Sequence, residues 1–397
     1  MSNWLENIIC ACCSKEKIIH IEEFDKDPLG WTHDVGYHPF GDFSMAAVYA
    51  NSIVETHSQF DVGKNAFFVG IYDGFSGDYT STFILANLFK NLVWHIQRNG
   101  DNMSEDILRQ VVAEIEESVM NGIRDAYEQC PELGIVGSSC LICILWEERL
   151  YIANLGDSRA VMGSSEIPFN RFLVQQLVRD HNACNEDIRI ELMNLHPDDP
   201  NIVTYNFDAW RVKGIREVSR GIGHAYWKRE PFTINSSNQV PESERVPSPF
   251  TRPLLSAEPE IHSRRIRESN KFIIFGSGGL WKFLTNEEAA KIVENNPREG
   301  IAKRLVMIAL EIAAGRRNTS YNELREIPQG HGVSRGPSVS VKGTRKEYHD
   351  DITVIVVFLD KMPNRNQTVM PPEFISFKAF SMMEASDFRY LNQRSES

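Results

Sequence analysis

Apolar residues along this chain form two kinds of pattern, one typical of buried strands and the other of amphipathic helices. Near-continuous apolar runs predict strands over 41–56, where a turn follows the strand, and over 66–74, 138–146, 149–163, 271–277 and 350–360. Apolar residues with a helical period predict helices over 78–98, 103–128, 186–195, 285–296 and 300–317. Thr285 and Glu288 have the spacing of a capping box at the start of one helix.

The order of these elements favours an α+β fold, because strands joined by tight turns, such as 138–146 and 149–163, pair antiparallel. Helices and strands come in blocks, which predicts sheets inside and helices outside. We expect a mobile N-terminal segment over 1–30, one domain over 31–360 and a poorly ordered C-terminal tail over 361–397. Within the domain, residues 196–255 are rich in prolines and polar residues, which predicts an irregular insertion.

The composition narrows the class of protein. The 397 residues carry a net charge of -12, without the basic surplus that a nucleic-acid-binding protein usually has, so we expect no nucleic-acid partner. The chain has no apolar run of membrane-spanning length, and we expect no signal peptide in its first residues. Its seven cysteines are an odd number in a long chain, which favours a reducing compartment over a disulfide framework.

Three of the cysteines lie close together near the N-terminus, at Cys10, Cys12 and Cys13. Beside apolar residues and two lysines, they could form a reversibly acylated anchor on a membrane surface. The other interpretation is a frayed terminus with incidental thiols. We expect a cytoplasmic or nuclear monomer, associated with the plasma membrane if these cysteines are acylated.

Acidic residues mark several strand or turn ends, at Glu55, Asp73, Asp157, Asp350 and Asp351. Carboxylates from separate strand ends can converge on one site for Mg²⁺ or Mn²⁺, which prefer oxygen ligands. Two such ions can activate a water and neutralise a phosphoryl group. Each acid alone also fits ordinary turn chemistry, and the spacing does not decide between the two interpretations.

Longer sequence motifs resemble those of a known protein family. In order along the chain, "VGIYDGFSG", "GSSCLICILWEERLYIANLGDSRAVMG", "VRDHN", "VSRGIGHAYWK", "FIIFGSGGLWKFLTNEEA" and "HDDITVIVVFLD" closely resemble the protein phosphatase 2C family, from about 30 to 360. "GDFSMAAVYAN", "HPDD" and "WRVKG" look like its plant D-type branch. The resemblance implies metal-dependent serine/threonine phosphatase activity. It also implies a β-sandwich of two antiparallel sheets flanked by helices in α-β-β-α layers, with two Mg²⁺ or Mn²⁺ ions at one end.

The resemblance also assigns roles to individual residues. Asp73 matches the aspartate that bridges the two ions, and the carbonyl of Gly74 matches a further ligand. Asp350 matches the closing aspartate of the site, and Glu55 matches the glutamate of an acidic pair. Asp157 matches the ligand of a third, weaker ion.

Several positions depart from the family pattern. Phe75 stands where the family has a histidine proposed as general acid, and Gly278 replaces a metal-binding aspartate. Thr56 replaces the second acid of the pair beside Glu55, Lys282 follows in a position that is usually acidic, and His224 replaces another acid. We expect these changes to weaken the site to one ion or to weak binding, unless neighbours such as Asp351, Asp78 or Ser76 compensate.

Two functions remain open from the sequence. The first is a catalytically impaired pseudophosphatase that binds phosphoproteins or regulatory proteins without hydrolysing phosphate esters. The second is an active Mn²⁺- or Mg²⁺-dependent phosphatase that hydrolyses phosphoserine and phosphothreonine with a metal-activated water. Whether the chain is an enzyme therefore depends on the site.

Overall fold

The computed structural model describes residues 21–166, 171–206, 208–229, 232, 244–246, 250, 252–330, 343–359, 375–378 and 384–392. Cys10, Cys12 and Cys13 lie outside these residues, so acylation of the cluster stays a prediction. In the described part of the chain, no helix has the length and apolar character needed to cross a membrane.

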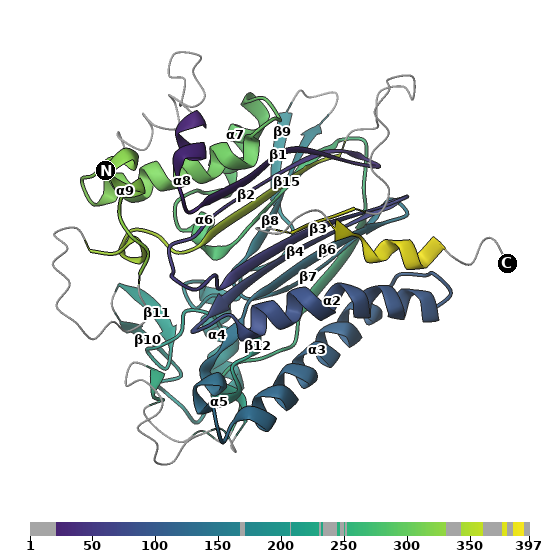
Figure 1. The fold of residues 1–397 in the computed structure, drawn as a ribbon. Helices are drawn as coiled ribbons and strands as arrows, with labels where there is room; N and C mark the ends of the chain where they lie inside the picture. The colour runs from purple at the N-terminus through teal and green to yellow at the C-terminus, as the bar shows by residue number, and fades with distance from the viewer. Residues whose placement is uncertain are drawn as a thin grey trace, which may run out of the picture.

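Two antiparallel sheets stack face to face at the centre of the molecule (Figure 1). The six-stranded sheet has the order β1-β2-β15-β14-β8-β9, with strands Gly30–His38, Gly41–Val48, Ile352–Phe358, Asn270–Gly276, Arg159–Glu166 and Arg171–Gln176. The larger sheet has the order β13-β7-β6-β4-β3-β16-β17, with strands Glu260–Arg265, Arg149–Leu155, Cys140–Trp146, Ala66–Phe75, Thr56–Gly63, Ile375–Lys378 and Glu384–Ala385. β5 (Gly137–Ser138) and β12 (Ile222–Gly223) extend it at one end.

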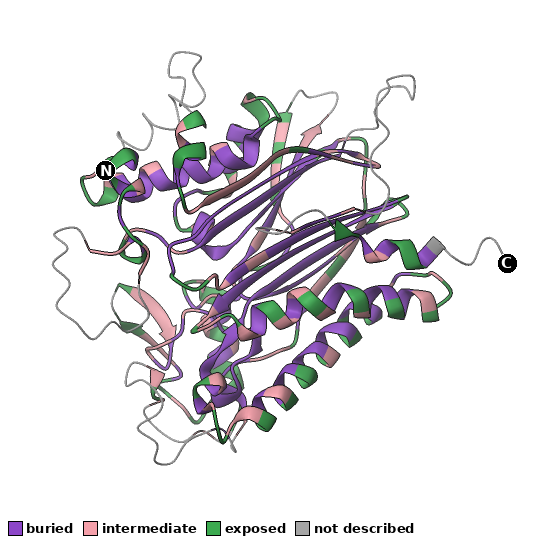
Figure 2. Cartoon of the chain, viewed as in Figure 1, coloured by how far each residue is buried: buried purple, intermediate pink, exposed green. Residues whose placement is uncertain are grey.

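The central strands are apolar on both faces because each face meets another layer. In β4, Phe67, Val69 and Ile71 pack into the core between the sheets, whereas Phe68 and Tyr72 face the helices outside. β15 alternates in the same way, and all seven of its residues are buried (Figure 2). A strand covered on both sides loses the polar alternation of a half-exposed strand, which is why the apolar runs were visible in the sequence.

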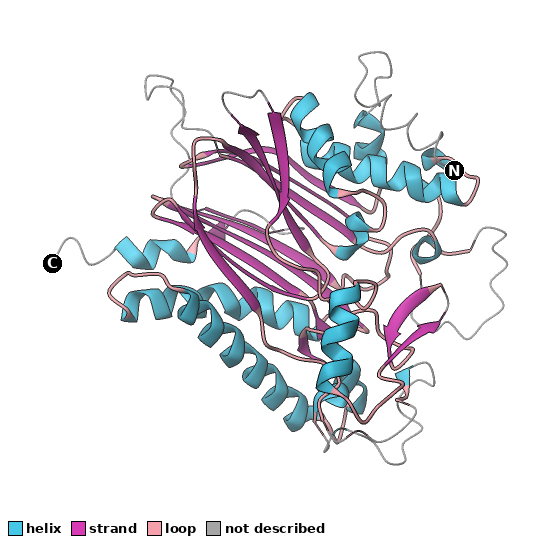
Figure 3. Ribbon diagram, turned by 180° about the vertical axis from the view of Figure 1, so that it is seen from behind, coloured by secondary structure: helices cyan, strands magenta, loops and turns pink. Residues whose placement is uncertain are grey.

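Helices cover the outer face of each sheet, which completes the α-β-β-α layers (Figure 3). α2 (Tyr79–Arg98) and α3 (Glu105–Ala126) pack on the larger sheet, and α7 (Asn286–Asn295) and α8 (Ile301–Arg316) pack on the six-stranded one. Thr285 and Glu288 form the expected capping box before α7. The α+β sandwich and its long helices are therefore confirmed, as is α4 (Glu186–Leu195).

Several strands did not stand out in the sequence. The strand expected at the start of 41–56 is β2, which ends at Val48, but the next strand, β3, begins at Thr56 and was not expected. β3 contains the buried polar residues Gln59 and Asp61, which hydrogen-bond to each other, so it shows no apolar run. β1, β9 and β13 lie at sheet edges and are partly exposed, which weakens their apolar pattern in the same way.

The insertion expected to be irregular contains regular structure. β10 (Val203–Asn206) and β11 (Ala209–Val212) form a hairpin, and α5 (Ala225–Lys228) follows β12. Trp227 of α5 is fully buried in a small core with Ile188 and Val212. The interpretation of 196–255 as irregular was therefore wrong for these elements, whose short length hides them from a pattern search.

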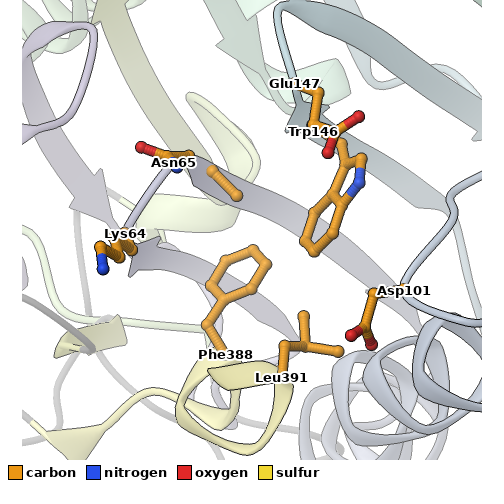
Figure 4. Close-up of a pocket in the computed structure, with 8 residues that line it drawn as sticks. Lys64, Asn65, Asp101, Trp146, Glu147, Phe388 and Leu391 are labelled. Atoms are coloured by element: carbon orange, nitrogen blue, oxygen red, sulfur yellow. The ribbon is translucent and has the colours of Figure 1, made fainter. Parts of the chain in front are cut away.

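The C-terminal part of the chain also departs from the expected tail. β16 pairs with β3, and the 3-10 helix η6 (Asp387–Asn392) packs beside α2. Phe388 is 2% exposed, and its ring stacks 6.4 Å from that of Trp146. Figure 4 shows Phe388 and Leu391 beside Trp146, lining a pocket. The prediction of a poorly ordered tail was wrong for these residues, because isolated aromatic residues carry the packing.

The remaining short helices connect the layers. They are η1 (Ile21–Lys26), η2 (Pro131–Ile135), α6 (Gly278–Trp281), α9 (Tyr321–Arg325) and η5 (Arg345–Glu347). α6 begins directly after β14, and η5 comes shortly before β15. The residues of α6 and those between η5 and β15 therefore lie at one end of the sandwich. Asp73, near the end of β4, lies at the same end.

Candidate functional site

Acidic residues from separate elements meet at this end of the sandwich. We call this group the acidic rim, and it consists of Glu55, Asp73, Asp157, Asp350 and Asp351. Asp73 lies near the end of β4, with Thr56 opposite it as its partner across the β3–β4 pair. The Thr56 hydroxyl donates a hydrogen bond of 2.6 Å to Asp73 Oδ1. Burial, together with the charges of Asp350 and Asp157, raises the pKa of Asp73 well above its ordinary value.

Gly74 and Glu55 meet through their backbones. The Gly74 amide donates to the Glu55 carbonyl at 3.2 Å, and a Cβ atom at position 74 would lie only 2.4 Å from that oxygen. Glycine is therefore required for this close approach of the two strands. The half-buried side chain of Glu55 has a raised pKa, because burial outweighs the charge of Lys346.

Asp351 and Asp350 follow η5 and differ in exposure. Asp351 is 1% exposed, and its Oδ1 accepts hydrogen bonds from the amides of Ala50 and Asn51, at 2.8 and 3.3 Å. Burial raises its pKa to about 7. The side chain of Asp350 is 42% exposed and lies at the surface of the rim, where Asn51 Nδ2 approaches its Oδ1 at 3.5 Å.

Asp157 lies in the turn between β7 and β8 and faces Gly278, the first residue of α6. A Cβ atom at position 278 would come within 2.9 Å of the Asp157 carboxyl carbon and of both its oxygens. The carboxyl of Asp157 therefore fills the space that a side chain at 278 would need. Asn182 donates to Asp157 Oδ2 at 3.2 Å, and burial raises the pKa of Asp157.

Lys282 brings a positive charge into the rim. It follows α6, and its Nζ lies 3.7 Å from Asp350 Oδ2. Although burial opposes its charge, the carboxylates of Asp350 and Asp157 raise the pKa of Lys282 well above its ordinary value, with smaller contributions from Glu217 and Asp73. The ammonium group is therefore charged at neutral pH and neutralises part of the rim from within.

Phe75 ends β4 beside a buried histidine. Its ring centroid lies 5.9 Å from that of His224, and the guanidinium carbon of Arg216 lies 6.0 Å from the Phe75 ring. Burial, and then the charges of Arg216 and Lys228, hold the pKa of His224 well below its ordinary value. His224 is therefore neutral at pH 7 and has no spare proton to donate as an acid in place of the missing histidine.

The rim offers carboxylate oxygens that suit a cation. Asp157 Oδ1 and Asp351 Oδ2 are buried without a hydrogen-bond partner among the described residues. Within those residues, no group of three or more His, Cys, Asp or Glu side chains has the geometry to hold a metal ion. Gly278 provides no ligand, and Lys282 already places a cation beside Asp350.

The sequence patterns missed several contacts that shape the rim. Asn51 supports the Asp350–Asp351 pair, Asn182 supports Asp157, and Glu217 contributes to the charge around Lys282. Asn182 belongs to the "VRDHN" motif and could have been identified from it. Asn51 likewise ends the "GDFSMAAVYAN" motif, whereas Glu217 lies outside the motifs that carry the resemblance. The role of the five acidic residues as metal ligands stays a prediction.

Comparisons with known proteins agree on one family. The model of that family, described as protein phosphatase 2C, matches residues 40–318. The rice protein "Probable protein phosphatase 2C 43" is 40% identical over 388 residues, which cover 95% of each chain. The Arabidopsis thaliana protein "Probable protein phosphatase 2C 68" is 41% identical over 358 residues, covering 89% of this chain and 86% of that one.

A solved structure has the same fold at much lower identity. The serine-threonine phosphatase 2C from Toxoplasma gondii superposes with a TM-score of 0.56 at 15% identity, over 84% of this chain and all of that one. A sex-determining protein from C. elegans reaches a TM-score of 0.54 at 16% identity, over 82% of this chain and 65% of that one.

Proposed function

This chain belongs to the protein phosphatase 2C family, and from that premise we propose that it is a catalytically impaired member. The family is metal-dependent, using Mg²⁺ or Mn²⁺, and acts on phosphoproteins. The proposed function is to bind phosphoproteins or regulatory proteins while hydrolysing phosphate esters slowly or not at all.

The charge of Lys282 is the observation that carries the proposal. An ion bound to Asp350 would lie roughly 6 Å from Lys282 Nζ, since the two side chains are 3.7 Å apart and metal–oxygen distances are about 2 Å. At that separation and an effective dielectric of ~20, two unit charges repel by about 3 kcal/mol. Solvent screening reduces this repulsion because the Lys282 side chain is 46% exposed. The repulsion that remains still disfavours a divalent ion at Asp350.

Gly278 adds to the same effect by removing an anionic ligand. The neighbouring carboxyl of Asp157 occupies that space instead, but it is held by Asn182 and faces Lys282 as well. Even the loss of a group that only supports a metal ligand typically costs about 10–100-fold in affinity or activity. We expect one ion at most, held by Asp73, the Gly74 carbonyl and Asp350.

Phe75 would slow the reaction even with metal bound. A positioned general acid typically contributes about 10²–10⁴-fold in rate, and phenylalanine has no proton to donate. His224 beside it is neutral, as its lowered pKa requires. The proposed losses at the metal site and at the acid need not add, because they belong to one catalytic unit.

Phosphatase assays test the proposal directly. We expect kcat/KM for p-nitrophenyl phosphate and for a phosphothreonine peptide, with added Mn²⁺, to be at least about 10³-fold below that of an active family member. Turnover that is removed by EDTA and lies within tenfold of the active enzyme would overturn the proposal.

A restored variant tests the residue assignments. Combining Gly278→Asp, Phe75→His and Thr56→Asp should raise Mn²⁺-dependent turnover, provided that Asp157 rotates to admit the new side chain at 278. The matched control is Lys90→Gln with Lys291→Gln, which changes the net charge equally on exposed helix surfaces and should leave turnover unchanged. Equal turnover in both variants would contradict the assignments.

An active Mn²⁺- or Mg²⁺-dependent serine/threonine phosphatase is the second candidate function. One observation favours it: Asp157 Oδ1 and Asp351 Oδ2 are buried without partners in the described chain, and such oxygens suit a hard cation. In this case the assay above would give robust turnover that EDTA removes.

A further inference from the structure

A groove at the side of the sandwich, away from the acidic rim, carries uncompensated positive charge. It lies between the open edges of the two sheets and encloses a volume of about 450 Å³. We call it the basic groove. Its floor is Leu150, Ile152 and Leu177 from the core between the sheets, and its walls include Gln175, Arg264 and Arg267.

Strand edges border this groove on both sides. β13 is the outermost described strand of the larger sheet, and β9 is the outermost described strand of the six-stranded sheet. The outer backbone groups of an edge strand are available for pairing with another extended segment. Arg264 spans the gap, because its Nη1 donates to Oε1 of Gln175 at 2.7 Å.

Carboxylates balance only part of the positive charge in the groove, which Arg264, Arg265 and Arg267 line. In the described part of the chain, neither Arg264 nor Arg267 forms an ion pair, whereas Arg265 pairs with Glu148. Burial and then the charge of Arg267 lower the pKa of Arg264, although an arginine stays protonated at neutral pH. An anionic ligand would offset the repulsion between these two guanidinium groups.

We propose that the basic groove binds an extended acidic peptide segment of a partner protein, which pairs with the free edge of β13. Alternate residues of the peptide face the groove, because Arg264 and its register partner Leu150 lie on the inner face of the sheet, and carboxylates at these positions contact Arg264 and Arg267. The residues between them point to the opposite face of the sheet. This is the recognition mode in which backbone pairing supplies affinity and alternate side chains supply specificity.

The groove is separate from the acidic rim. In the strand register, the last residue of β13, Arg265, lies opposite the first residue of β7, Arg149. Asp157 lies beyond the other end of β7. Seven strand residues at about 3.3 Å each place the two regions on the order of 20 Å apart. The proposal therefore goes beyond the proposed function, because binding in the groove does not depend on whether the rim hydrolyses phosphate.

Fluorescence anisotropy tests the proposal with a defined probe. The probe is a fluorescein-labelled eight-residue peptide of alternating glutamate and valine, and a lysine–valine peptide is its counterpart. We expect the full-length protein to bind the acidic probe, with an affinity that falls as salt rises, and to bind the lysine peptide at least tenfold more weakly. Hydrogen exchange at β13 should slow when the acidic probe binds.

Charge reversal identifies the groove as the binding place. R264E combined with R267E should weaken binding of the acidic probe by at least about tenfold. The matched control, K90E with K291E, makes the same change in net charge on exposed helix surfaces and should retain the affinity. Thermal unfolding of each variant verifies that it is folded.

Three outcomes would overturn the proposal: equal loss of affinity in both double variants, unchanged exchange at β13, or no binding of the acidic probe. Vesicles of phosphatidylcholine with phosphatidylserine provide a further arm. Arginine-dependent binding to these vesicles, without binding to the peptide, would identify the groove as a membrane contact and would also overturn it.

Discussion

The acidic rim and the basic groove treat charge in opposite ways. In the rim, carboxylates from distant parts of the chain lie together, with Asp73 and Asp351 buried, and Lys282 Nζ lies 3.7 Å from the more exposed Asp350. In the groove, Arg264 lies on the edge strand β13 and Arg267 in the connection after it, and no ion pair of either is found in the described chain. The rim supplies its own cation, whereas no described carboxylate pairs with Arg264 or Arg267 in the groove.

This difference separates a catalytic site from a binding surface. A family that depends on divalent cations needs an acidic rim whose charge is left for the metal. Here part of that charge is already balanced by a side chain of the protein, which favours partner binding over catalysis as the proposed function. The groove, in contrast, presents two arginines that have no ion-pair partner among the described residues, which suits an anionic ligand.

The largest expected effect lies behind the rim, where a buried ion pair anchors the segment that leads to Asp350. Arg345 and Asp27 are both fully buried, and Arg345 Nε also contacts Nε2 of His349 at 2.9 Å. Asp27→Ala leaves the arginine charge buried and unpaired, so the free energy of unfolding should fall by about 3–5 kcal/mol.

Urea unfolding measures this effect. Glu22→Ala, an exposed acid in the same segment, is the control and should change the free energy of unfolding by less than about 0.5 kcal/mol. Similar small effects for both variants would mean that the rim is not anchored by this pair.

A buried acid that forms no ion pair among the described residues sharpens the comparison. Asp61 is buried in β3 and accepts a hydrogen bond of 2.5 Å from Gln59, and burial raises its pKa to about 6. Between about pH 4 and 6, the carboxyl of Asp61 is ionised in the unfolded chain but still protonated in the folded protein. The free energy of unfolding should therefore fall as pH rises through that window, by up to about 1.4 kcal/mol per pH unit, relative to Asp61→Asn.

Urea unfolding of the wild type and of Asp61→Asn at four pH values between 4 and 7 measures the difference. Most other titrating groups cancel between the two proteins. The free energy of unfolding of the wild type minus that of Asp61→Asn should fall as pH rises. A value that stays constant across the window, or that rises with pH, would contradict the effect of burial on Asp61.

Removing the internal cation should move the rim toward metal binding. Lys282→Ala takes away the ammonium group beside Asp350, and we expect Mn²⁺ to bind about tenfold more tightly, which corresponds to about 1.4 kcal/mol. Calorimetric titration measures the affinity, with Lys90→Ala as the control on an exposed helix surface. An affinity for Mn²⁺ that is the same in Lys282→Ala and the wild type would remove the main support for the proposed function.

The smallest effect is expected at the surface pair beside the groove. Arg265 and Glu148 are 3.0 Å apart, but their side chains are 75% and 62% exposed. Glu148→Gln should therefore change the free energy of unfolding by less than about 1 kcal/mol. A larger loss in thermal or urea unfolding would show that exposed charges near the groove contribute to the fold.

The core of the fold could be predicted because its strands and helices obey strong local patterns. β4, β6 and β15 are buried on both faces, so their sequences are almost entirely apolar. The apolar patterns did not indicate β3 and β16. These strands bury polar residues, whose hydrogen-bond partners lie in other segments. Asp61 of β3, for example, is satisfied partly by residues near the C-terminus.

The rim could be predicted in part. Asp73, Asp157 and Asp350 belong to motifs that resemble the family, and their elements end at the same side of the sandwich. Two contacts could not be predicted, because each joins residues that lie far apart in the sequence. They are the contact of Asp157 with Gly278 and the approach of Lys282 to Asp350. Such contacts depend on side-chain geometry, which no periodicity or motif spacing contains.

The most direct measurement is the number of ions that the rim holds in the wild-type protein. Crystals soaked in MnCl₂ and measured with anomalous diffraction would locate each bound ion by its signal. The account predicts no ion or a single ion beside Asp73 and Asp350. Two strong peaks about 3.5–4 Å apart, bridged by the Asp73 carboxylate, would contradict it.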